Sequence, residues 1–175
     1  MPDAGLHVRR ATADDAERIA AVLQAVTAER VHSAIDRPWS VAEQRRYLAS
    51  LSPRDAFHLA ATDTGEVVGY QSLDRYSTVL DSMAHVGQLG TFVLPAWRGR
   101  GVGRALFGET TRFAAAAGYR KFVIAVRASN ASAQAFYRRL GFADCGRLQA
   151  QVVIDGRDDD EILMEFFLTI SGPGW

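Results

Sequence analysis

A turn rich in glycine and arginine, between an apolar run and a helical pattern, constrains this chain more than any other stretch. The apolar run, residues 88–94, is typical of a buried strand and stops at Pro95. Residues 98–104 then read Arg-Gly-Arg-Gly-Val-Gly-Arg, and apolar residues recur at helical spacing until Gly118. Glycines let an anion approach the backbone, and the first turn of a helix leaves its N–H donors unpaired. The turn therefore predicts a pyrophosphate site.

The spacing of these glycines excludes two common nucleotide-binding motifs. A Walker loop ends in Gly-Lys-Ser/Thr, whereas Gly103 is followed by Arg104. The dinucleotide fingerprint needs a third glycine three residues after the second, where this chain has Arg104 or Leu106. The spacing that does occur, Arg98-x-x-Gly101-x-Gly103, resembles the coenzyme A pyrophosphate loop of the GNAT N-acetyltransferase superfamily.

A second motif of the same superfamily lies at residues 130–142. Asn130, Ala133, Tyr137 and the Gly-Phe pair that ends this range match the pattern N-x-x-A-x-x-x-Y-x-x-x-G-F. Two spaced motifs in the right order are more specific than either one alone. The resemblance covers roughly residues 6–168, and it implies both the fold and the coenzyme.

Strands and helices alternate along the whole chain, which predicts a mixed α/β fold. The expected strands are residues 6–10, 57–62, 67–76, 85–94, 121–126, 147–154 and 161–168, with an acidic loop at 155–160. The expected helices follow Thr12, Ser40, Gly101 and Ser129. No linker interrupts this alternation, so residues 1–175 are expected to form a single domain. The resemblance implies a mixed sheet of about seven strands, splayed at the cofactor site and flanked by about four helices.

Composition excludes several classes of partner. Lys plus Arg and Asp plus Glu are 20 each, so net charge favours neither nucleic acid nor an acidic membrane surface. Cys145 is the only cysteine, and the histidines have no metal-binding spacing, so neither a disulfide nor a metal site is expected. The chain lacks an apolar run of membrane-spanning length and a secretory signal, which favours a cytoplasmic protein. A homodimer is the usual default for a soluble oligomer.

The resemblance implies that acetyl-CoA is the acyl donor. Its pantetheine arm would lie between the splayed strands 85–94 and 121–126 and pair with backbone groups around Phe92 and Val93, as an added strand does. A strand N–H would stabilise the oxyanion. Asn130 would hydrogen-bond the pantetheine. The pyrophosphate would be bound by a charge-assisting Arg98 and by the backbone amides of Gly99, Arg100, Gly101, Val102, Gly103 and Arg104.

Tyr137 is the candidate general acid. Collapse of the tetrahedral intermediate expels a thiolate, and a phenol with an ordinary pKa of about 10 is protonated at neutral pH and can donate to it. Helical spacing places Asn130 and Tyr137 on one face of their helix. The alternative is that Tyr137 packs in the core beside Phe136.

The general base is left open. Some relatives have a carboxylate about eleven residues before the loop, where this chain has Gly87, followed by Gln88. His85 shares a strand face with residue 87 and is titratable near neutral pH, so it is the first candidate, with a purely structural role as its alternative. Glu29, Asp81 and bulk water are the other candidates.

The expected activity is direct transfer of an acetyl group to a primary amine, without a covalent enzyme intermediate. A small molecule or amino acid is the leading acceptor, and a protein N-terminus or lysine side chain is the second. A non-catalytic acyl-CoA sensor is the alternative from another class, because the strand carboxylate is missing. An unrelated nucleotide-binding protein is disfavoured by the glycine spacing.

Overall fold

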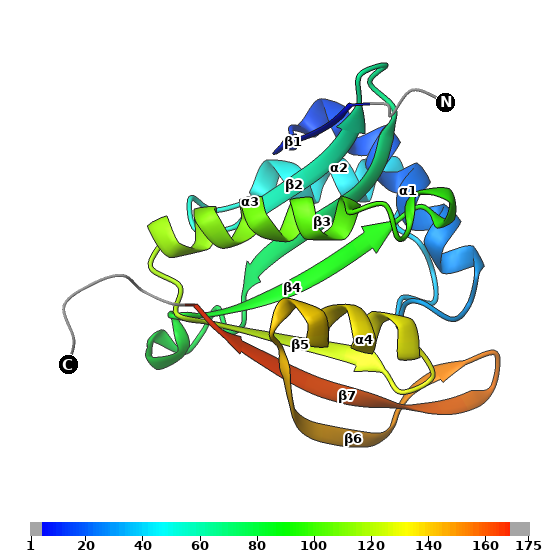
Figure 1. Cartoon of the computed structure of the whole chain (residues 1–175), viewed down its shortest axis with the longest axis vertical. Helices are drawn as coiled ribbons and strands as arrows, with labels where there is room; N and C mark the ends of the chain where they lie inside the picture. The colour runs from blue at the N-terminus through cyan, green and yellow to red at the C-terminus, as the bar shows by residue number, and fades with distance from the viewer. Residues whose placement is uncertain (1–4, 169–175) are drawn as a thin grey trace.

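A computed structural model of the protein describes residues 5–168, which form one seven-stranded mixed sheet and four α-helices, as predicted (Figure 1). Strand order is β1-β2-β3-β4-β5-β7-β6, and β4 with β5 is the only parallel pair. The strands are β1 (Leu6–Arg10), β2 (Ala56–Thr62), β3 (Val67–Arg75), β4 (Val86–Val93), β5 (Lys121–Arg127), β6 (Ala143–Ile154) and β7 (Arg157–Phe167). The helices are α1 (Ala16–Ala28), α2 (Val41–Ser50), α3 (Val102–Ala116) and α4 (Ala131–Leu140).

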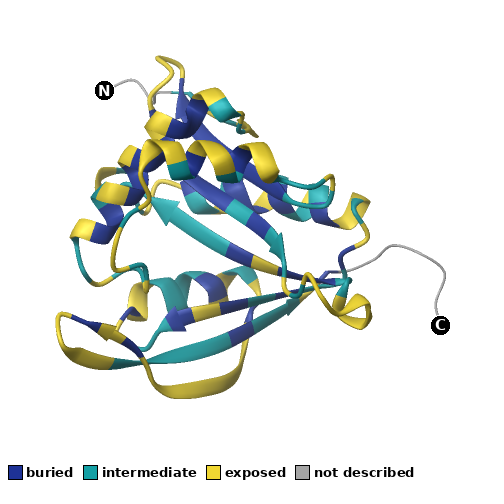
Figure 2. Ribbon diagram, turned by 180° about the vertical axis from the view of Figure 1, so that it is seen from behind, coloured by how far each residue is buried: buried dark blue, intermediate teal, exposed yellow. Residues whose placement is uncertain are grey.

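The helices cover the sheet from two sides. The apolar stripe of α1, which includes Ile19 and Leu23, packs with α2 against Phe57 and Tyr70 on one face. Helices α3 and α4 lie on the other face, where Phe107 joins the main cluster. Figure 2 shows the sheet from the side opposite to α4. There α1 and α2 pack against β2 and β3, and the half formed by β5 and β7 is left more open.

The hairpin of β6 and β7 differs from the prediction. An acidic loop was expected over residues 155–160, but the turn is only Asp155-Gly156, with φ of 51° and 72°. An Asp-Gly pair suits a tight hairpin turn because both residues adopt positive φ. Asp159 and Asp160 are therefore strand residues, and each forms an ion pair with an arginine. The prediction was wrong because these paired carboxylates do not require a solvated loop.

Strands β4 and β5 part soon after they begin to pair. Their register runs only from Val86 opposite Lys121 to Gln88 opposite Val123, and the carboxyl ends then diverge. The predicted splay is present. Beyond Gln88 the side of β4 that faces β5 has no strand to bond, and this creates the gap on which the candidate site depends. None of the helices in residues 5–168 is long and apolar enough to cross a membrane.

Candidate active site

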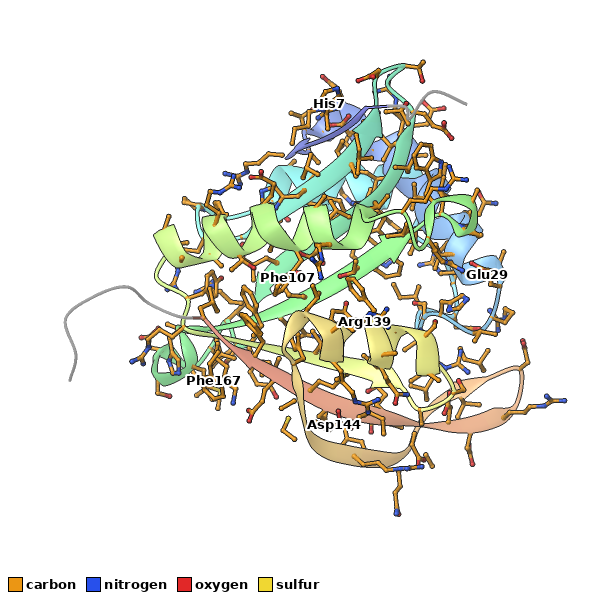
Figure 3. The ribbon with its side chains drawn as sticks, in the orientation of Figure 1. His7, Glu29, Phe107, Arg139, Asp144 and Phe167 are labelled. Atoms are coloured by element: carbon orange, nitrogen blue, oxygen red, sulfur yellow. The ribbon has the colours of Figure 1, made fainter. Side chains whose placement is uncertain are left out.

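A cavity of about 390 Å³ lies between the diverging end of β4 and the helices α3 and α4. Figure 3 labels Glu29, at the end of α1, and Arg139, which lies on α4 and lines the cavity. Arg100 and His85 are the predicted site residues that do not line it. The predicted residues that do line it are Phe92, Val93, Arg98, Gly99, Gly101, Val102, Gly103, Arg104, Asn130 and Tyr137.

The turn before α3 presents a continuous run of free backbone donors. Within the described chain, the N–H groups of residues 99–104 have no hydrogen-bond acceptor, and the first bond into α3 is from Ala105 to Gly101. Gly99 and Gly101 have φ of 73° and 84°, a region that costs other residues about 1–2 kcal/mol. These two glycines adopt the left-handed backbone conformations that form the turn. An anion in the cavity would meet several N–H donors and the positive end of a helix.

The three glycines of the loop serve two purposes. A Cβ at Gly99 or Gly101 would meet no atom within 4 Å, so the backbone conformation alone requires glycine there. A Cβ at Gly103 would lie 2.8 Å from the ring of Phe136, which itself lines the cavity. Gly103 therefore lets α3 and α4 approach each other beside the site, a packing role that the sequence motif does not reveal.

The arginines of the loop have distinct partners. Arg98 donates two bonds to the carboxylate of Glu29, at 2.9 and 2.6 Å, and one from Nε to the carbonyl of Val93. This arrangement fastens the loop to the end of α1 and balances the charge of Arg98. The guanidinium of Arg100 lies 5.3 Å from the ring centre of Trp97.

Two other arginines supply positive charge at the cavity. Arg104 and Arg139 line it, and the side chain of neither has a hydrogen bond or ion pair with another described residue. Their guanidinium groups are free to bind an anion. Arg139 belongs to the second sequence motif, but the resemblance gave it no role. Its exposed position two residues after Tyr137 was the available signal.

Alternate residues of β4 turn their backbone groups into the gap. Leu94 donates its N–H to Val68 at the end of the β3–β4 ladder, so even-numbered residues of β4 bond β3. Odd-numbered residues, including Thr91 and Val93, therefore point their N–H and C=O groups toward the parted strand β5. Of the two residues proposed to pair with the pantetheine, Val93 has this orientation, whereas the backbone of Phe92 faces β3.

The hydroxyl of Tyr137 is held at the point where the strands part. It donates to Thr91 Oγ1 at 2.8 Å, and Gln71 Nε2 donates to the same oxygen at 2.7 Å. Tyr137 is buried, and burial raises the pKa of its phenol to about 12, so it is protonated at neutral pH. Thr91 and Gln71 were not predicted. Thr91 could have been found as the hydroxyl within the apolar run.

Asn130 begins helix α4. Its Oδ1 accepts from the backbone N–H of Ala133 at 3.1 Å, which is an N-cap bond, and also from the hydroxyl of Ser132. The other end of the amide, Nδ2, lies 3.5 Å from the carbonyl of His32 at the rim of the cavity. The side chain therefore has a structural role, and Nδ2 is the donor that it can offer to a bound molecule.

The candidate bases do not meet Tyr137. His85 precedes β4 and lines neither cavity; it lies six positions before Thr91, or about 20 Å along the strand. The bidentate contact with Arg98 lowers the pKa of Glu29, which makes its carboxylate a weaker base. Asp81 is exposed on the loop between β3 and β4. Each candidate is therefore kept away from the parted strands or weakened by its partner.

Core side chains occupy the space around Gly87, the position at which some relatives have a carboxylate. A Cβ at Gly87 would lie 2.6 Å from Leu73 and 3.2 Å from Phe122. A longer side chain would require both neighbours to move. Glycine at this position is therefore a packing requirement of this chain.

A second cavity of about 540 Å³ lies on the opposite face of the sheet. It begins at Gln88 and Val123, the last paired residues before the strands diverge. Glu161 on β7 is the charged residue in its lining, and the sequence did not single it out. The two cavities thus border the same parting of β4 and β5 from opposite sides.

The comparisons with known proteins agree with this geometry. A model of the acetyltransferase (GNAT) family matches residues 20–142. N-alpha-acetyltransferase RimI of Mycobacterium tuberculosis is 33% identical over 123 residues, which are 70% of this chain and 73% of that protein.

Two solved structures share the fold. One is yncA of Salmonella typhimurium with its cofactor acetyl-CoA, at TM-score 0.86 and 20% identity over 98% of both chains. The other is a phosphinothricin acetyltransferase of Sinorhizobium meliloti in complex with AcCoA, at TM-score 0.84 and 24% identity over 97% of this chain and 93% of that one. With the family match, these likenesses confirm the resemblance that the two motifs indicated. The chain belongs to the acetyltransferase (GNAT) family.

Proposed function

We propose that this N-acetyltransferase moves the acetyl group of acetyl-CoA directly to a primary amine of a small molecule. The observation that supports this most strongly is the run of free N–H donors at residues 99–104, which opens into the same cavity as Tyr137. A long phosphorylated thioester suits this arrangement, because the anion-binding turn lies on one side of the strand gap and the protonated phenol lies on the other. The donor N–H groups and Arg104 would bind the pyrophosphate.

The chain's own groups then serve the transfer as follows. The pantetheine lies along β4, where Val93 and Thr91 offer backbone groups, and a strand N–H stabilises the carbonyl oxygen as charge develops on it. The acceptor ammonium first loses one proton to water; the neutral amine then attacks the carbonyl carbon, and the surplus proton of the adduct also passes to water. The C–S bond breaks while the Tyr137 hydroxyl shares its proton with the departing sulfur, and the released CoA thiolate then takes up a proton from water. We assign no step to His85, because it lies at the far end of β4.

A protein N-terminus is the second candidate acceptor. The 33% identical relative is named an N-alpha-acetyltransferase, which favours an α-amino group. The second cavity, at about 540 Å³, has room for one or two residues of a peptide as well as for a small amine. A sensor without catalysis is disfavoured by the aligned hydroxyl of Tyr137.

Two measurements test this function. Thermal unfolding with acetyl-CoA, CoA, ATP and NAD should show a stabilising shift for the first two ligands only. Release of the CoA thiol is then followed with small amines, amino acids, polyamines and short peptides. No shift with acetyl-CoA would refute the donor. A shift without thiol release from any acceptor would support the sensor instead.

A further inference from the structure

The open face of β4, β5 and β7 has the shape and location of an acceptor site. Arg127, Ala125 and Val123 of β5 lie opposite Glu161, Leu163 and Glu165 of β7, and these six residues share one face of the sheet. The strands part at Gln88 and Val123, so a group held between them is reached from this side. Residues of the loop between β3 and β4 line one side of the cavity.

Apolar side chains make most of this cavity. Tyr76, Leu80, Met83 and Leu148 line it and are 49%, 49%, 36% and 38% exposed, which is unusual for large apolar residues gathered in one place. None of the described residues that line the cavity is Lys, Arg or His. An apolar body would bury these side chains, whereas a bound anion would find no positive charge.

Glu161 differs from the other acids of its strand. Asp159 is paired with Arg127, Asp160 with Arg147 and Glu165 with Lys121. Glu161 is partly buried, and within residues 5–168 its carboxylate has no hydrogen bond or ion pair. Burial, together with the negative charge of Asp159, raises the pKa of this carboxyl. Both effects would be relieved by a cation in the cavity.

We infer that Glu161 binds the ammonium group of the acceptor, and that the acceptor is a primary amine on an apolar body without a neighbouring anionic group. This inference rests on the proposed function and adds its substrate class. A carboxylate next to the amine would approach Glu161, and Arg127, the cation opposite Glu161 on β5, is already bonded to Asp159 and to the carbonyls of Arg30 and Ser33. The chain should therefore discriminate against amino acids such as phosphinothricin, which carries a carboxylate and a phosphinate.

The test compares two acceptors that differ by one carboxylate. The wild-type protein should acetylate 2-phenylethylamine with a kcat/KM at least tenfold above that for phenylalanine or phosphinothricin. Glu161→Gln should raise the KM for 2-phenylethylamine about tenfold or more, with kcat and the KM for acetyl-CoA changed less than threefold. Glu161→Arg should narrow or reverse the preference between the two acceptors.

Glu165→Gln is the matched control, because Glu165 lies on the same face of β7 but is already paired with Lys121. It should leave the KM for the amine unchanged. Equal use of phenylalanine and 2-phenylethylamine, or an unchanged amine KM in Glu161→Gln, would overturn the inference while acetyl transfer itself stands. No binding of acetyl-CoA, or no thiol release with any acceptor, would overturn the proposed function and the inference together. Thermal unfolding with acetyl-CoA confirms that each variant is folded.

Discussion

Replacement of Tyr137 by Phe tests the proposed acid with a change of one hydroxyl group. The phenol has a pKa of about 12, raised by burial from 10.0, whereas a thiol has a pKa of about 8.5. Complete proton transfer from this phenol to a thiolate is therefore unfavourable, and the proton is shared only while the C–S bond is breaking. General acids accelerate reactions about 10²–10⁴-fold, and the difference between these two pKa values favours the lower end of that range. We expect kcat to fall about 100-fold, or about 2.7 kcal/mol.

The assay is release of the CoA thiol at saturating acetyl-CoA and amine. The variant also loses the bond to Thr91, which should lower the free energy of unfolding by about 1 kcal/mol and leave the protein folded. Tyr70→Phe is the matched control. It deletes another buried phenol hydroxyl, at a ring stacked between Phe57 and Phe92, and should keep kcat within twofold.

The pH dependence gives an independent check of the same reasoning. With a pKa of about 12, Tyr137 stays protonated through neutral and moderately alkaline pH, so it should cause no loss of kcat below about pH 11. A fall of less than threefold in Tyr137→Phe would remove this residue from the mechanism. An alkaline limb near pH 9 that disappears in the variant would refute the argument from burial.

Two further substitutions test the loop and the N-terminal end of α1. Gly101→Ala forces φ of 84° on a residue with a Cβ, which costs about 1–2 kcal/mol. The affinity for acetyl-CoA, measured by calorimetry, should therefore fall about 5- to 30-fold. The control is Gly118→Ala, at φ of 83° beyond α3, which should lower stability equally without changing that affinity. The bidentate contact with Arg9 holds the pKa of buried Asp15 at about 2, below its ordinary 3.8, so this stability is present above pH 4 and is lost as pH falls toward 2. Urea unfolding should show that Asp15→Asn loses about 2 kcal/mol at pH 7 and little at pH 2, and an equal loss at both values would contradict this linkage.

The cofactor-binding residues could be predicted because they lie close together in the sequence. The anion-binding turn lies within residues 98–104, and α4 brings Asn130 and Tyr137 into the same cavity at helical spacing. The resemblance also correctly predicts the sheet and the divergence of its one parallel pair. A sequence motif does not predict which partner each of its residues binds in the folded chain. Arg98 has the required spacing, yet its guanidinium binds Glu29, a contact across 69 residues.

The proposed acceptor cavity could not be predicted from a local sequence motif. Its cavity combines Gln88 of β4, Val123 of β5, Glu161 of β7 and the loop around Leu80, which no local spacing connects. Its location depends on strand order, since β7 inserts between β5 and β6 and brings Glu161 beside β5. The acidic run at residues 158–160 suggested a solvated loop, so the adjacent Glu161 was assigned no role. The alternation of Glu161 and Leu163 on one face of a strand was the available signal.

The single parallel pair explains how one sheet serves two ligands of opposite charge. Every other pair is antiparallel and stays bonded along much of its length, whereas β4 and β5 are joined by a crossover through α3 and pair over three residues. The two cavities lie on opposite faces of the sheet at this parting. Free N–H groups and Arg104 lie on one face, and the unpaired Glu161 lies on the other. With the proposed acceptor, an anionic donor and a cationic amine would each be favoured on its own side, so that neither ligand would compete for the other's site.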